Sequence, residues 1–142
     1  MTRNQGETGM SKKILVVDDD ESIMEVIQMV LESEGHQIQA SFDESCFPLT
    51  EDNLPDLILL DVMLLGGDGR EACQQLKSNA ATAHIPVIIL SAHSDADKVA
   101  NMSGANDFLE KPFDVDALIN IVQKHLDLLI PSNRLLSEET FG

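Results

Sequence analysis

Three short, mostly apolar runs constrain the fold of this chain most strongly. They are ILVV (14–17), DLILL (56–60) and PVIIL (86–90). A strand with one face in water alternates apolar and polar residues, whereas a parallel strand covered on both faces is apolar throughout. The runs therefore predict buried parallel strands, which need long crossover connections between them.

Helical patterns separate these runs. Residues 68–79 and 95–104 suit two helices, and a longer amphipathic helix is predicted after Asp114, which is placed to cap it. Another helix is predicted to end at Gly35, because the apolar residues before it follow one helix face: Ile23, Val26, Ile27, Val30 and Leu31. The apolar face of the last helix is Val115, Leu118, Ile119, Val122, Leu126 and Leu129.

Two weaker strand patterns complete the alternation, at residues 36–42 and 105–110. Residues 43–53 make a poor helix, since Pro48 interrupts them. Repeated strand–helix units predict an α/β fold, a doubly wound parallel sheet of five strands with right-handed crossovers.

Composition excludes several classes of function. The 142 residues hold 9 Lys and Arg against 25 Asp and Glu, a formal net charge of −16, which opposes direct binding to nucleic acid or to an anionic membrane. Cys46 and Cys73 lie in no metal-type spacing, so we expect reduced thiols and a cytoplasmic protein. We expect residues 1–10 to be a flexible leader, 11–130 the folded domain and 131–142 a C-terminal extension.

Chemically active side chains follow the predicted strands. Asp18 and Asp19 follow the first, Asp61 the third and Ser91 the fourth, and Lys111 lies just past the fifth. In a parallel α/β sheet these carboxyl ends share one edge, where ligands bind. Clustered carboxylates repel one another unless a hard cation such as Mg²⁺ lies among them.

Such an edge is equipped for phosphoryl transfer. The loose transition state of that reaction needs positioning and neutralisation of charge. Asp61 would attack as nucleophile and form an acyl phosphate. Mg²⁺, Lys111 and the hydroxyl of Ser91 would then hold the phosphoryl oxygens.

Four segments carry a resemblance to a known family: ILVVDDDE, PDLILLDVMLLGGDG, IPVIILSAHS and GANDFLEKPF. In this order and spacing they resemble the receiver domains of two-component response regulators, the CheY-like family, over nearly all of residues 12–130. CheY is a known example of the flavodoxin-like strand order 2-1-3-4-5, so the resemblance implies that order here.

The resemblance also implies roles around the acceptor. Asp18 and Asp19 match the acidic pair, with Asp19 favoured as the direct Mg²⁺ ligand. Asp61 matches the phospho-acceptor, and Met63 lies where a backbone carbonyl completes the metal site. Asp20 is left over, and we expect it to cap the first helix.

Further positions match the switch. Ser91 matches the family's Ser/Thr and Lys111 its lysine, and the peptide bond before Pro112 is expected to be cis. Phe108 falls at the aromatic switch position, although it could be a plain core residue. Met63 and His93 flank the acceptor, where they are expected to influence the lifetime of the phosphoryl group.

The function implied is that of a phospho-accepting regulator, which acts enzymatically only on its own phosphorylation and dephosphorylation. A histidine kinase or histidine-phosphotransfer protein would donate the phosphoryl group. The surface formed by the family's fourth helix (here 95–104), its fifth strand (105–110) and its fifth helix (the one after Asp114) would then change to control a downstream effector. Phosphorylated copies could also pair. Two departures from the family pattern are Leu65, where a proline is usual, and Pro48 in the second helix.

Two alternatives stay open. Residues 18–22 loosely fit the D-x-D start of haloacid-dehalogenase-like phosphatases, with Asp18 as nucleophile and Asp20 as acid/base. Those enzymes carry a further acidic pair well downstream of the lysine, whereas only Asp114 and Asp116 follow here. The second alternative is a pseudo-receiver that keeps the fold and serves only for docking.

Overall fold

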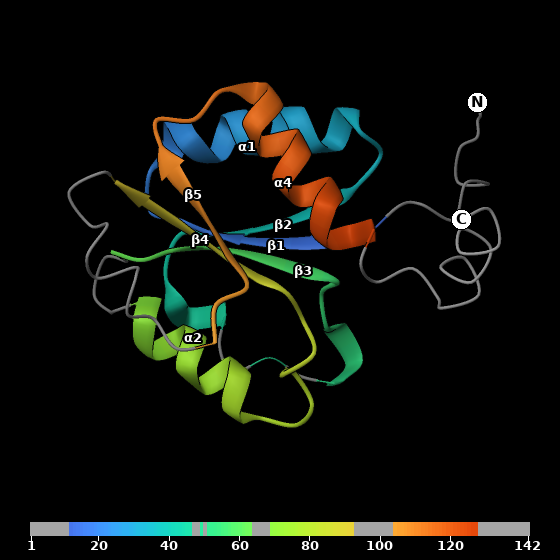
Figure 1. The fold of residues 1–142 in the computed structure, drawn as a ribbon, viewed down its shortest axis with the longest axis vertical. Coiled ribbons are helices and arrows are strands. Elements are labelled where there is room, and N and C mark those ends of the chain that lie inside the picture. The colour runs from blue at the N-terminus through green and yellow to red at the C-terminus, as the bar shows by residue number, and fades with distance from the viewer. Residues whose placement is uncertain (1–11, 47–48, 50, 64–68, 93–103, 128–142) are drawn as a thin grey trace, which may run out of the picture.

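The computed structural model describes residues 12–46, 49, 51–63, 69–92 and 104–127. They form one five-stranded parallel sheet in the order β2-β1-β3-β4-β5, drawn in Figure 1. The flavodoxin-like α/β fold expected from the sequence is confirmed. The strands are β1 (Lys13–Val17), β2 (Gln37–Ser41), β3 (Leu57–Asp61), β4 (Val87–Ala92) and β5 (Asp107–Lys111).

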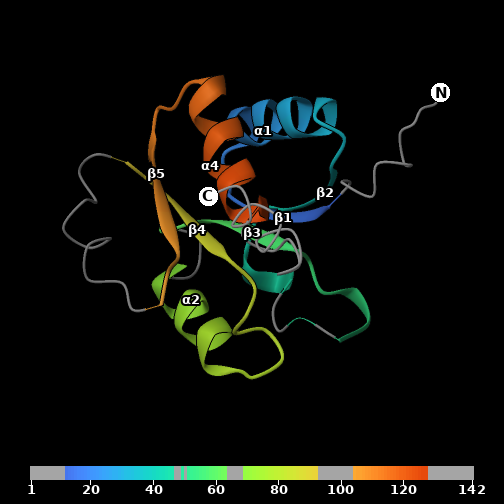
Figure 2. The same cartoon turned by 45° about the vertical axis from the view of Figure 1, so that its right-hand side comes forward.

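Helices cover both faces of this sheet. Helices α1 (Glu21–Ser33) and α4 (Val115–Asp127) pack together on one face, and α2 (Gly69–Ser78) lies on the other, as Figures 1 and 2 show from two directions. Alternate residues of β1 enter the two cores: Ile14 and Val16 pack towards α1 and α4, Leu15 and Val17 towards α2. All four side chains are buried, which explains why the run is apolar throughout.

Carboxylates begin two of the helices. Asp20 is the N-cap of α1, and its side chain accepts hydrogen bonds from the backbone N–H groups of Ser22 and Ile23. Asp114 caps α4 in the same way: its Oδ1 accepts a hydrogen bond from Ala117 N at 2.7 Å. Gly35, with φ +95°, follows the end of α1, in the left-handed region that favours glycine. The two caps and the stop at Gly35 agree with the sequence prediction.

Residues 43–53 contain two 3₁₀ turns, η2 (Glu44–Cys46) and η3 (Glu51–Asn53), and no α-helix in the part that the structure describes. This agrees with the weak helical pattern there, although Pro48 itself lies outside the described residues. The helix predicted over 95–104 also lies outside them, except for Gly104. Leu129, predicted on the last helix, is likewise outside.

No helix among the described residues is both long enough and apolar enough to span a membrane.

Two glycines with positive φ offer a matched test of this packing. At Gly104, φ +89°, an added Cβ would lie 2.8 Å from Cγ of Lys77, whereas at Gly35 it would meet nothing within 4 Å. Lys77 is fixed, because its ammonium donates to the carbonyls of Ala83 and Ile85 at 3.1 and 2.6 Å. We expect Gly35→Ala to lower the free energy of unfolding by about 1–2 kcal/mol through backbone strain.

Gly104→Ala should cost at least about 1 kcal/mol more, because it adds overpacking to the same strain. Urea unfolding followed by circular dichroism measures both variants, as the chain has no Trp or Tyr to report by fluorescence. An equal loss of unfolding free energy in the two variants would show that the side chain of Lys77 can move away from the added methyl group at no cost.

Candidate functional site

Three carboxylates meet at the carboxyl edge of the sheet. Asp18 follows β1 and Asp61 ends β3, and these two strands are paired neighbours. One oxygen each of Asp18, Asp19 and Asp61 lies within 4.8 Å of the others. Asp18 is 0% exposed and Asp61 5% exposed, while Asp19 faces solvent. The structure thus brings together the three acids that the sequence singled out.

Lys111 supplies a positive charge from the last strand. Its Nζ lies 2.8 Å from Oδ2 of Asp18 and 3.7 Å from Oδ1 of Asp61. Burial alone would lower the pKa of Lys111, but the contact with Asp18 and the charges of Asp61 and Asp20 together outweigh it, so the pKa is raised and the ammonium stays charged. The Lys111–Pro112 peptide bond is cis, as the resemblance implies.

Backbone groups hold the buried carboxylate of Asp18 in place. Its Oδ1 accepts a hydrogen bond from Asp20 N at 2.9 Å, and its own N–H donates to the carbonyl of Ser41 at 3.1 Å. Among the described residues, the ammonium of Lys111 is the partner of Oδ2, as an ion pair without an aligned hydrogen bond. The sequence reasoning missed the parts played by Asp20 N–H and Ser41; the short D-x-D spacing typical of an Asx-turn was the available signal.

Asp61 is the acid with the least compensated charge. Burial, followed by repulsion from Asp18, raises the pKa of Asp61 to about 6, against the lowering effects of Lys111 and of the hydrogen bond from Met63 N. That bond, to Oδ1, is 3.1 Å long. Three carboxylates facing one ammonium leave an excess of negative charge on hard oxygen donors, which fits a divalent cation such as Mg²⁺.

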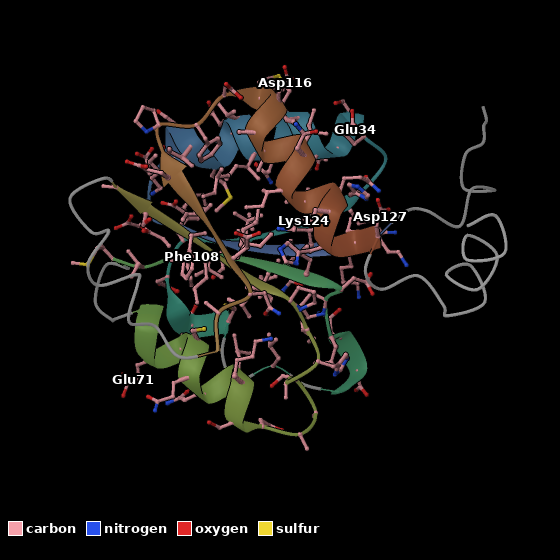
Figure 3. The ribbon with its side chains drawn as sticks, viewed as in Figure 1. Glu34, Glu71, Phe108, Asp116, Lys124 and Asp127 are labelled. Carbon is pink, nitrogen blue, oxygen red and sulfur yellow. The ribbon has the colours of Figure 1, made fainter. Side chains whose placement is uncertain are left out.

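The remaining predicted site residues lie on β4, on β5 and after β3. Ser91 is 5% exposed and follows Leu90, the partner of Asp61 across the sheet. Phe108, labelled in Figure 3, lies on β5 opposite Ile89 and is 39% exposed. The alternative that Phe108 is a plain core residue is therefore wrong for this structure. Met63 is 51% exposed, and His93 and Leu65 lie outside the described residues.

The family comparison agrees with this arrangement. The family model described as response regulator receiver domain matches residues 14–123, most of the chain. The chain belongs to the response regulator receiver domain family. The matched span runs from the second residue of β1 into α4, so it includes the acidic site and all of the sheet except Lys13.

Curated relatives of this receiver domain are longer proteins. The chain is 39% identical over 139 residues to the alkaline phosphatase synthesis transcriptional regulatory protein PhoP of Bacillus subtilis, covering 94% of this chain and 57% of PhoP. It is 40% identical over 108 residues to the response regulator PleD of Caulobacter vibrioides, covering 74% of this chain and 24% of PleD. The receiver domain therefore spans only part of each relative.

Solved structures show the same fold. The receiver domain of NtrX from Brucella abortus superposes with a TM-score of 0.73 at 34% identity, covering 80% of this chain and 98% of that one. The signal receiver domain of a histidine kinase from Syntrophus aciditrophicus gives a TM-score of 0.77 at 27% identity, covering 84% and 93%. The receiver domain is thus similar to domains found in both regulators and kinases.

The raised pKa of Asp61 predicts that its buried carboxylate lowers the free energy of unfolding by an amount that depends on pH. Between the ordinary Asp pKa of about 4 and about 6, the folded state keeps a proton that the unfolded chain releases, so stability falls as pH rises. In metal-free buffer at pH 7.5, Asp61→Asn should therefore raise the free energy of unfolding by about 1–3 kcal/mol, at about 1.4 kcal/mol for each unit of pKa shift.

Urea titrations of both proteins at several pH values between 4.5 and 7.5 measure this difference. It should widen as pH rises. A difference that stayed constant over this range would contradict a raised pKa at Asp61.

Proposed function

We propose that residues 11–130 act as a phosphorylation-activated switch, in which Asp61 accepts a phosphoryl group from a phosphohistidine. The observation that carries this proposal is a nearly buried carboxylate placed 3.7 Å from a lysine ammonium, beside two further carboxylates within 4.8 Å. Membership of the receiver domain family supports it. Residues 1–10 and 131–142 are proposed to flank this domain.

The acidic cluster would hold Mg²⁺. Its ligands would be carboxylate oxygens of Asp18, Asp19 and Asp61, with the backbone carbonyl of Met63 completing the set. When bound, the ion supplies positive charge that neutralises the phosphoryl oxygens during transfer.

The residues of the chain perform the transfer itself. A carboxylate oxygen of Asp61 attacks phosphorus, forming a P–O bond as the P–N bond of the donor breaks, and the released imidazole takes a proton. The ammonium of Lys111 and the hydroxyl of Ser91 stabilise the charge on the phosphoryl oxygens. Water later cleaves the acyl phosphate, at a rate to which Met63 and His93 contribute.

The response to phosphorylation would pass from β4 to β5. Ser91 is buried on β4, and Phe108 is half-exposed on the neighbouring strand. We propose that Ser91 moves towards the new phosphoryl group and that Phe108 turns inward, which changes the surface formed by β5 and α4. A packing element with two arrangements can be biased by such a local change in charge.

Partners follow from this mechanism. A histidine kinase or a histidine-phosphotransfer protein would supply the phosphoryl group in the cytoplasm. A downstream effector protein or domain would read the β5–α4 surface, through which phosphorylated copies could also pair. The role is that of a regulator whose only catalysis acts on its own phosphorylation and dephosphorylation.

Labelling by a small phosphodonor tests the assignment of Asp61. Incubation with acetyl phosphate and Mg²⁺ should add one phosphoryl group to the wild-type protein, detected as a mass increase of the intact chain. Asp61→Asn should abolish this label, because an amide oxygen is a poor nucleophile. Chelation of Mg²⁺ should slow labelling of the wild type.

Asp127→Asn is a matched control. It removes a carboxylate from the exposed end of α4, labelled in Figure 3, and should label as the wild type does. A label that persisted in Asp61→Asn but disappeared in Asp18→Asn would favour the phosphatase alternative. A wild-type protein that neither bound Mg²⁺ nor took up phosphate would favour the pseudo-receiver.

A further inference from the structure

Asp20 stands next to the acidic cluster without belonging to it. The carboxylate oxygens that approach within 4.8 Å of one another come from Asp18, Asp19 and Asp61. Asp20 is exposed, and its side chain is engaged by the first turn of α1: Oδ1 accepts from Ser22 N at 2.9 Å and from Ile23 N at 3.1 Å. The carboxylate of Asp20 therefore caps α1 and is not part of the acidic cluster.

The backbone N–H of Asp20, in contrast, contacts a member of the acidic cluster. This N–H donates to Oδ1 of Asp18 at 2.9 Å, while the carbonyl of Asp20 accepts from Met24 N at 3.0 Å. The two cap bonds and the bond to Met24 fix Asp20 in an extended conformation, with φ −90° and ψ 112°. That conformation sets the direction in which the N–H points.

Asp18 is consequently held at both carboxylate oxygens. Asp20 N–H donates a hydrogen bond to Oδ1, and Lys111 Nζ lies 2.8 Å from Oδ2. Because Asp19 lies between Asp18 and Asp20 in the chain, the same bond closes a tight loop around it. The acidic cluster is thus arranged before any cation enters, which reduces the ordering cost of binding.

We propose that Asp20 is a positioning residue, whose N-cap bonds hold Asp18 and Asp19 in the geometry that receives Mg²⁺. This inference rests on the proposed metal site and assigns it a determinant outside its ligands. We assign the effect to the cap and not to charge, since the carboxylate of Asp20 is exposed and bonded to the first turn of α1, and pairwise interactions between exposed charges are weak.

Three variants separate the cap from charge and from general stability. Asp20→Ala removes the cap and one negative charge. Asp20→Asn keeps the cap, because Asn caps helices as well as Asp does, and removes the same charge. Glu25→Gly is the matched control: Glu25 is exposed on α1 beyond its first turn, and the change removes one charge and weakens the same helix by a similar amount, with the cap intact.

Isothermal titration calorimetry with Mg²⁺ gives the dissociation constant of each variant. We expect Asp20→Ala to weaken Mg²⁺ binding by about fivefold or more. A lost N-cap typically costs about 1 kcal/mol, which corresponds to about a fivefold change in a dissociation constant. Asp20→Asn and Glu25→Gly should stay within about twofold of the wild type, even though Asp20→Ala and Glu25→Gly show similar urea midpoints.

A metal-free measurement gives a second readout. In the presence of a chelator, amide hydrogen exchange at residue 20 should be protected in the wild type, Asp20→Asn and Glu25→Gly, and fast in Asp20→Ala. Equal weakening of Mg²⁺ binding in Asp20→Ala and Glu25→Gly would overturn the inference, and so would equal weakening in Asp20→Ala and Asp20→Asn.

The outcome also distinguishes this inference from the proposed function. A wild-type protein that bound Mg²⁺, with an Asp20→Ala variant that bound it equally well, would overturn the role of Asp20 alone. A wild-type protein that bound no Mg²⁺ would overturn both.

Discussion

The ion pair between Asp18 and Lys111 depends on the pairing of four of the five strands of the sheet. The carboxylate of Asp18 is 0% exposed, and a buried charge is strongly destabilising unless it is paired. Its partner comes from β5, which β3 and β4 separate from β1 in the strand order. The charge at the end of the first strand is therefore compensated only when four neighbouring strands are in register, so the same contact ties the fold to the site.

The sequence predicted most of this arrangement because the strands and the site share one signal. A strand covered on both faces must be apolar throughout, so the positions of Asp18 and Asp61 were visible as sudden charges at the ends of such runs. Parallel topology then placed those ends on one edge of the sheet. Helix caps at Asp20 and Asp114 were equally legible, because the preference for carboxylates at N-caps is local.

Other features could not be predicted, since they arise from three-dimensional contacts. The closer approach of the Lys111 ammonium to Asp18, at 2.8 Å, than to Asp61, at 3.7 Å, follows from the path of its side chain. The exposure of Phe108 depends on what covers an edge strand, which periodicity along β5 does not encode. The bond from Asp20 N to Asp18 needed the observed backbone angles, and a list of residue types carries none of them.

The position of Lys111 suits a site that must respond to a change in charge. At an effective dielectric constant of about 20, unit charges attract by about 6 kcal/mol at a separation of 2.8 Å and by about 4.5 kcal/mol at 3.7 Å. The two carboxylates thus compete for one ammonium, and the closer contact favours Asp18 by about 1.5 kcal/mol, or about tenfold. A phosphoryl group on Asp61 would add negative charge to the weaker side and reverse this preference. Because Lys111 ends β5, the strand that carries Phe108, the group that would respond to phosphorylation is part of the edge strand that the proposed partners would read.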